Sequence, residues 1–230
     1  MVRAVIFDLF NTLVYGALNP LWNNLAQKTG LEVAVFQEKW RQSRETAQME
    51  LKPLAARFEA LFRELGVGWS PAIAEEVSDM RMAAVRQVLV TPREKVLETI
   101  RMLRSADIGT GVISNASAEV SLFWPESPLS TLIDAAVFSG NVGLSKPDPR
   151  IYRHICDVLG VEPESCVYVG DGGDGELTGA KSVGMLPVQI LVRSSPDTEA
   201  AHYIGTLEEL LPILGLPRSS GETIVDQRAE

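Results

Sequence analysis

Four short polar motifs, each at a place that suits the end of a β-strand, hold the side chains that could do chemistry. They are Asp8, the pair Ser114 and Asn115, Lys146, and an acidic loop with Asp171 and Glu176. In an open α/β sheet, ligands bind beyond the carboxyl ends of the strands. A carboxylate there is a candidate nucleophile, while hydroxyl, amide and ammonium groups can hold an oxyanion. The motifs therefore predict a site that binds an anion, with Asp8 as the attacking group.

The acidic loop favours a metal over a bare phosphate. Its carboxylates Asp171, Asp174 and Glu176 repel one another unless a cation lies between them. Glycine-rich loops often bind phosphate through backbone N–H groups, but this loop carries too many acids for that. The alternative interpretation is a solvated acidic turn.

Five short apolar runs predict the elements that position these motifs. The runs are Val2–Phe7, Ile108–Ile113, Ala135–Phe138, Cys166–Val169 and Leu186–Val192. Because they are apolar on both faces and separated by helical segments, we expect a buried parallel sheet. Helices on both faces would make the fold a doubly wound α/β sheet.

The first two runs are about 100 residues apart, far more than one crossover helix needs. Helical spacing of apolar residues fills most of this gap, and Ser70 followed by Pro71 predicts a helix start. Thr91 to Glu94 predicts a second start, with a capping box. We therefore expect a helical cap at 15–88 and a core made of 1–14 and 89–230, with the cap acting as a lid.

Composition limits the classes of function. A net charge of −9 argues against a nucleic-acid groove and against docking on anionic membranes. An acidic protein can still bind a small anionic substrate if a metal or lysine reverses the local field. The two cysteines form no metal or disulfide motif, and no segment resembles a signal peptide or a membrane span. A cytoplasmic setting is expected, and the oligomeric state is left open.

Together, in this order, the four motifs resemble the haloacid dehalogenase-like (HAD) hydrolase superfamily. The resemblance implies a Rossmann-like core with a helical cap inserted after the first motif. It implies the following roles: nucleophile for Asp8, substrate contacts for Thr12, Ser114 and Asn115, fixed cation for Lys146, metal-binding acid for Asp171, and second acid for Glu176.

Charge balance predicts the cofactor. Asp8, Asp171 and Glu176 carry about −3 when ionised and Lys146 returns about +1, so one Mg²⁺ would neutralise the remainder. Mg²⁺ prefers oxygen ligands and commonly takes one or two carboxylates with water and substrate phosphate. We expect Asp8, Asp171 and the backbone carbonyl of Phe10 as ligands, with Glu176 acting mostly through water.

Phe10 departs from the family pattern. Phosphatases of the family carry an acid at that position, which protonates the leaving oxygen and then activates water. Loss of such a group typically costs roughly 10²- to 10⁴-fold in rate. One interpretation is a Mg²⁺-dependent phosphatase that acts on small phosphorylated metabolites with good leaving groups.

A second interpretation is a 2-haloacid dehalogenase, since halide leaves without a proton and dehalogenases of the family carry an aromatic residue at this position. Arg41, which the resemblance makes a substrate ligand, and Tyr152 also match dehalogenase positions. Against this, Asp171 would place an unneeded anion beside Asp8 and repel a haloacid. We therefore favour metal-dependent hydrolysis. A weakly catalytic member that binds a ligand or partner is a third interpretation.

Overall fold

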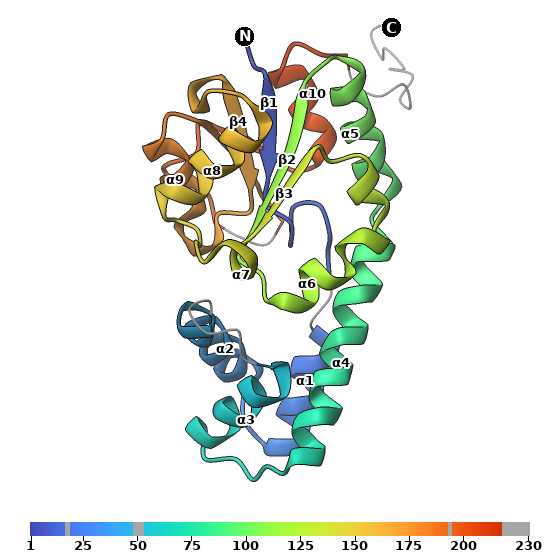
Figure 1. Cartoon of the computed structure of the whole chain (residues 1–230), viewed down its shortest axis with the longest axis vertical. Helices are drawn as coiled ribbons and strands as arrows, with labels where there is room; N and C mark the ends of the chain where they lie inside the picture. The colour runs from blue at the N-terminus through green and yellow to red at the C-terminus, as the bar shows by residue number, and fades with distance from the viewer. Residues whose placement is uncertain (17–18, 48–52, 193–194, 218–230) are drawn as a thin grey trace, which may run out of the picture.

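Six parallel strands form the centre of the molecule (Figure 1). The structure is a computed structural model, and it describes residues 1–16, 19–47, 53–192 and 195–217. The sheet order is β3-β2-β1-β4-β5-β6, and every neighbouring pair is parallel. The strands are β1 Ala4–Phe7, β2 Gly109–Ser114, β3 Ala135–Phe138, β4 Cys166–Gly170, β5 Leu186–Ile190 and β6 His202–Ile204. The predicted fold class is confirmed, although the sequence patterns did not reveal β6.

Helices cover both faces of this sheet because alternate strand residues point to opposite sides. On one face, Val5 and Phe7 of β1 belong to a core cluster with apolar residues of α5 (Glu94–Ser105) and α10 (Leu210–Ile213). On the other face, Ile6 belongs to a second cluster with residues of α8 (Pro149–Leu159) and α9 (Glu176–Ser182). The sheet is therefore doubly wound, as the apolar runs predicted.

The remaining helices of this part lie on the second face of the sheet or at the ends of its strands. The second face carries α8 Pro149–Leu159 and α9 Glu176–Ser182, while α6 Ala118–Phe123 and α7 Ser139–Val142 follow β2 and β3. Single 3₁₀ turns lie at η1 Trp124–Glu126, η2 Pro128–Thr131, η3 Pro163–Ser165, η4 Gly173–Gly175 and η5 Leu207–Glu209.

Four helices between β1 and α5 form a separate bundle beside the carboxyl ends of the strands (Figure 1). They are α1 Asn19–Thr29, α2 Val33–Ala47, α3 Leu54–Glu64 and α4 Pro71–Val90. The bundle has an apolar cluster of its own, which includes Trp22, Trp40 and Phe58. The last turns of α4 instead join the core of the sheet through Val85 and Leu89.

We retain the division into a cap at 15–88 and a surrounding core as a proposal. Its second boundary falls inside α4, which runs without interruption from the bundle to the sheet. Within the described ranges, none of the helices combines the length and apolar character that crossing a membrane requires.

The two predicted helix starts had different outcomes. Ser70 accepts a hydrogen bond from the backbone N–H of Ile73, so its N-cap role is confirmed. The capping box at Thr91 is wrong, because Arg93 precedes α5 without a side-chain cap bond. Thr91 instead ends α4 and donates its hydroxyl proton to the carbonyl of Gln87 at 2.7 Å.

Gly179 provides a test of the packing between α9 and the loop 143–148, which carries Lys146 and is called the lysine loop below. A Cβ atom built there would lie 2.7 Å from the backbone oxygen of Pro147 and 2.7 Å from the ring and hydroxyl of Tyr152. Gly179→Ala should therefore destabilise the protein by roughly 1–3 kcal/mol, although alanine in a helix is ordinarily favourable. Urea unfolding measures the change.

The matched control for this test is Gly68→Ala, where nothing lies within 4 Å of the added Cβ. It should leave the free energy of unfolding almost unchanged. Equal stability of the two variants would contradict the close packing at Gly179.

Candidate active site

The sheet order brings two of the predicted motifs together at one point. The chain runs outward from β1 through β2 to β3 and then crosses back to β4 on the other side of β1, so the ends of β1 and β4 flank the place where the strand order reverses. Phe7 pairs with Val169 in register, and the backbone N–H of Asp8 donates to the carbonyl of Val169 at 2.8 Å. Asp8 and the loop that begins at Asp171 therefore emerge side by side.

Lys146 lies between two buried carboxylates. Its Nζ donates to Asp8 Oδ1 and to Glu176 Oε2, each at 2.5 Å. Lys146, Asp8 and Glu176 are only 5%, 7% and 1% exposed, so this is an internal ion cluster rather than a surface pair. The three residues come from the end of β1, the loop before α8 and the start of α9, and the cluster ties these segments together.

Tyr168 is part of the same cluster. Its hydroxyl donates to Glu176 Oε2 at 2.8 Å and accepts from Lys146 Nζ at 3.2 Å. Tyr152 packs edge-on against this ring and donates to the backbone oxygen of Glu176 at 2.8 Å. The Glu176 Oε1 atom accepts from the backbone N–H of Gly172 at 3.0 Å. Both carboxylate oxygens of Glu176 are thus held in place.

Two carboxylates share one ammonium group, so the buried cluster has an excess of negative charge when all three groups are ionised, and this excess favours protonation of the carboxylates. Burial raises the pKa of Glu176 to about 8, against the opposing effect of Lys146. Burial likewise raises the pKa of Asp8, and Asp171 adds to that effect while Lys146 opposes it. Burial alone would lower the pKa of Lys146, but the two carboxylates outweigh it and keep the lysine charged.

Asp171 completes a group of three carboxylates. One oxygen from each of Asp8, Asp171 and Glu176 lies within 4.8 Å of the others. Oxygens on opposite sides of a Mg²⁺ ion are about 4.2 Å apart, given ligand distances of 2.0–2.1 Å. The Asn11 amide donates to Asp171 Oδ2 at 3.0 Å and orients it. These residues fit a magnesium ion bound by Asp8 and Asp171, with Glu176 held back by Lys146.

Asn115 contacts the lysine loop from the end of β2. Its Oδ1 accepts from the backbone N–H of Lys146 at 2.8 Å, and its Nδ2 donates to the Lys146 carbonyl at 2.9 Å. The same Nδ2 lies 3.1 Å from Asp174 Oδ2. Asn115 therefore positions the lysine, and the substrate contact predicted for it stays a prediction.

The other predicted substrate ligands have different surroundings. Thr12 is buried, and its hydroxyl is 3.5 Å from Asp8 Oδ2. Ser114 is buried at the last position of β2. Phe10 is half-buried and packs against the core cluster of the sheet. Arg41 belongs to α2, but its side chain lies outside the described residues.

Sequence patterns did not identify Tyr168 or Asn11 as site residues. A signal for Tyr168 was present, because a phenol within an otherwise apolar buried strand needs a hydrogen-bond partner. Asn11 has a φ of 61°, a left-handed conformation that asparagine adopts more readily than most residues. Its contact spans 160 positions of the chain and becomes visible in the tertiary structure alone.

Comparison with known proteins gives relatives of two kinds. The chain is 26% identical over 225 residues to (S)-2-haloacid dehalogenase 4A from Burkholderia cepacia. The aligned residues cover 93% of this chain and 95% of that protein. The chain is also 26% identical over 203 residues to glyceraldehyde 3-phosphate phosphatase from Methanopyrus kandleri, with 83% and 84% covered. The relatives therefore include both a dehalogenase and a phosphatase.

Solved structures show the same fold. A crystal structure of a dehalogenase with an intermediate complex superposes with a TM-score of 0.72 at 23% identity, covering 92% of this chain and 96% of that one. A HAD phosphatase from Thermococcus onnurineus gives 0.63 at 24% identity, covering 94% and 100%. The family model for haloacid dehalogenase-like hydrolases matches residues 2–184. With this match over most of its length, the chain belongs to the haloacid dehalogenase-like hydrolases.

Proposed function

We propose that this protein is a Mg²⁺-dependent phosphatase that acts on small phosphorylated metabolites with good leaving groups. The observation that carries the proposal is the group of three carboxylates around one lysine, whose ligand oxygens lie within 4.8 Å of one another. A metal-free site of this charge would repel an anionic substrate. The cytoplasmic setting and the anionic substrate are part of the same proposal.

In this mechanism a carboxylate oxygen of Asp8 attacks phosphorus, and the bond from phosphorus to the leaving oxygen breaks with its electron pair. Lys146 holds Asp8 in position and balances part of its charge. Water then attacks phosphorus in the covalent aspartyl phosphate and releases phosphate, which regenerates Asp8. Bound to Asp8 and Asp171, Mg²⁺ would supply charge neutralisation for the phosphoryl oxygens.

Phe10 determines which leaving groups this site suits. An aromatic ring cannot donate a proton to the departing oxygen, so leaving groups that are stable as anions are favoured. Acyl and aryl phosphates meet this condition, whereas alkyl phosphates do not. The absence of a general acid affects the first step most, because negative charge develops on the leaving oxygen in that step.

Dehalogenation of a 2-haloacid is the second candidate. Phe10 favours it, since halide departs without a proton, and one relative that matches nearly the full chain is named a 2-haloacid dehalogenase. Asp171 counts against it, because Asn11 orients this carboxylate beside the nucleophile. A single panel of substrates distinguishes the two reactions.

Activity is expected to require magnesium and Asp171. The panel contains acetyl phosphate, 4-nitrophenyl phosphate and 2-chloropropionate, each with Mg²⁺ and with a chelator. Phosphate release should need Mg²⁺, and Asp171→Asn should reduce kcat/KM by 10²-fold or more, since it removes a metal ligand. Free phosphate and halide are measured directly.

Four outcomes would contradict the phosphatase proposal. Halide release in the chelator would support the dehalogenase instead. Phosphate release that survives both the chelator and Asp171→Asn would exclude the metal role. Turnover that persists in Asp8→Asn would exclude Asp8 as the nucleophile, and a complete lack of turnover would favour a protein that binds a ligand without catalysis.

Restoring an acid at position 10 should extend the range of leaving groups. Phe10→Asp is expected to raise kcat/KM at least about 10-fold for an alkyl phosphate, because a general acid typically contributes 10²–10⁴-fold. Acetyl phosphate should gain far less. Phe10→Leu, which removes the same ring from the core cluster, is the matched control. An equal change in kcat/KM for both substrates would contradict the interpretation that the missing acid at position 10 limits the leaving group.

The metal-free protein should lose stability as the pH rises from about 5 to 8. The pKa of Glu176 is about 8 in the folded protein, above its ordinary value of 4.5. In this window the folded state keeps a proton that the unfolded chain has released, so stability falls by up to about 1.4 kcal/mol per pH unit. Urea unfolding at several pH values measures the slope.

Glu176→Gln is the control for this pH dependence, since the amide does not titrate. Its slope between pH 5 and 8 should be smaller than that of the wild type. Saturating Mg²⁺ should also reduce the wild-type slope, because the ion favours the ionised carboxylates. Identical slopes in the two proteins would show that Glu176 does not titrate in this range.

A further inference from the structure

Gln189 is a buried amide in the otherwise apolar strand β5. The residue is only 1% exposed, and its neighbours Val188 and Ile190 belong to the core of the sheet. Burying an amide costs free energy unless its polar atoms form hydrogen bonds. Gln189 pairs in register with Gly170, the residue that precedes Asp171, so it lies on the strand next to the start of the acidic loop.

The amide of Gln189 joins two segments of the chain. Its Nε2 donates to the backbone carbonyl of Asp171 at 3.1 Å and to that of Ser195 at 3.0 Å. Its Oε1 accepts from the backbone N–H of Asp197 at 2.7 Å. Because carbonyl oxygens only accept and a backbone N–H only donates, these partners determine the orientation of the amide. Gln189 therefore ties the acidic loop to residues 195–197.

The acidic loop needs such an anchor because it is rich in glycine. Gly172, Gly173 and Gly175 follow Asp171, and glycine gives the backbone more conformational freedom than any other residue. Gly172 has a φ of 90°, a left-handed conformation that favours glycine. A Cβ atom at Gly172 would lie 2.7 Å from Gln189 Nε2. The loop is thus packed directly against this amide.

Contacts from three directions hold Asp171. The Asn11 amide donates to Oδ2 at 3.0 Å, and the backbone N–H of Gly173 donates to Oδ1 at 2.9 Å. Gln189 holds the main chain of the same residue. Without that bond, the glycines would allow Asp171 to move away from Asp8, although the site needs one oxygen of each within 4.8 Å of the other. A misplacement of about 1 Å is enough to cost roughly 10²-fold in rate.

We propose that Gln189 is a positioning residue for the metal site, because it holds Asp171 where its carboxylate and that of Asp8 can bind one Mg²⁺ together. The inference rests on the proposed function in one respect, that the site binds this ion. It adds a residue of β5 that acts through Asp171 and controls the affinity for Mg²⁺. Groups that orient metal ligands typically contribute about 10- to 100-fold to that affinity.

Calorimetric titration with MgCl₂ in the absence of substrate tests the proposal. Gln189→Met keeps the length of the side chain but cannot donate to the Asp171 carbonyl, so the Kd for Mg²⁺ should rise at least about 10-fold. Asp171→Asn should remove the binding altogether. Because excess ion compensates for a higher Kd, the phosphatase activity of Gln189→Met should recover as the Mg²⁺ concentration is raised.

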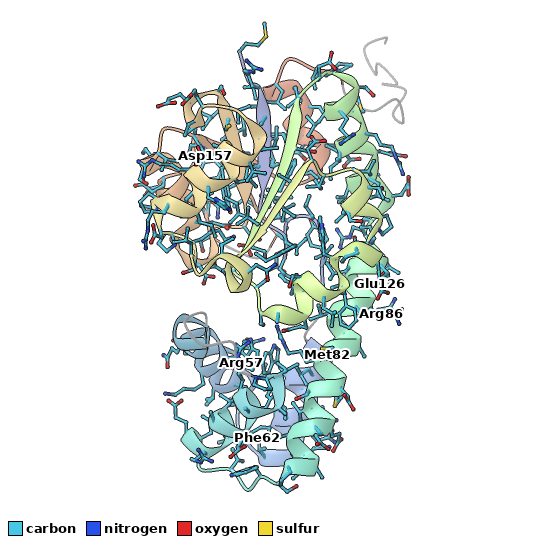
Figure 2. The ribbon with its side chains drawn as sticks, viewed as in Figure 1. Arg57, Phe62, Met82, Arg86, Glu126 and Asp157 are labelled. Atoms are coloured by element: carbon cyan, nitrogen blue, oxygen red, sulfur yellow. The ribbon has the colours of Figure 1, made fainter. Side chains whose placement is uncertain are left out.

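Two control variants separate positioning from a loss of stability and from weak binding of Mg²⁺ at the surface. Thr110 is buried near the amino end of β2, where its hydroxyl donates to the Leu132 carbonyl at 3.1 Å. Thr110→Val should lower the free energy of unfolding in urea without changing the Kd for Mg²⁺. Asp157→Asn removes an exposed carboxylate of α8 (Figure 2) and should also leave the Kd unchanged.

Gln189→Asn applies the same test with a smaller change. It keeps an amide but is shorter by one C–C bond, about 1.5 Å, so its N–H groups do not reach the Asp171 carbonyl and its Kd should rise as well. This variant decides the question if Gln189→Met does not fold. The proposal is overturned if a folded Gln189 variant binds Mg²⁺ with the wild-type Kd, or if Thr110→Val weakens the binding equally.

Failure of the phosphatase proposal gives a different result, because the wild type would then bind no Mg²⁺ in the titration. Amide hydrogen exchange of the metal-free protein decides the role of Gln189 in that case. The N–H groups of Gly172 and Gly173 donate to Glu176 Oε1 and Asp171 Oδ1. They should exchange at least about 10-fold faster in Gln189→Met than in the wild type. Equal exchange rates would show that Gln189 does not hold the loop.

Discussion

The ammonium group of Lys146 shared by Asp8 and Glu176 is the interaction on which the rest of the site depends. It connects the end of β1, the loop before α8 and the start of α9, and all three side chains are buried. Removing one charged partner from such a cluster leaves an uncompensated buried charge, which is strongly destabilising. The lysine loop, the end of β1 with Asp8 and the start of α9 with Glu176 are therefore fixed as one unit.

The elements around this unit serve to hold it rather than to react. Tyr168 fixes both Lys146 and Glu176 from the adjacent strand, and Asn115 fixes the backbone of the lysine from β2. The excess negative charge that Asp8, Asp171 and Glu176 carry when ionised is the physical reason for proposing a divalent cation.

The helical bundle is connected to the part of the molecule around the sheet through charge as well as through packing. α4 extends from the bundle into the core of the sheet, and its Arg81 forms a buried ion pair with Glu119 of α6. A buried pair of this kind fixes geometry more than it adds stability. The bundle is thereby held beside the carboxyl ends of the strands (Figure 1).

The sequence by itself determined the doubly wound sheet, most strand positions and the identity of the chemical groups, because apolar runs and strand-end polar residues are local signals. It could not show that Glu176 is held by Lys146, that Asn11 orients Asp171, or that Thr91 ends one helix instead of starting the next. It also missed β6, whose three residues pair with β5 at the sheet edge. Tertiary structure decided these points, since each depends on contacts between segments distant in the chain or on competition between neighbouring helix ends.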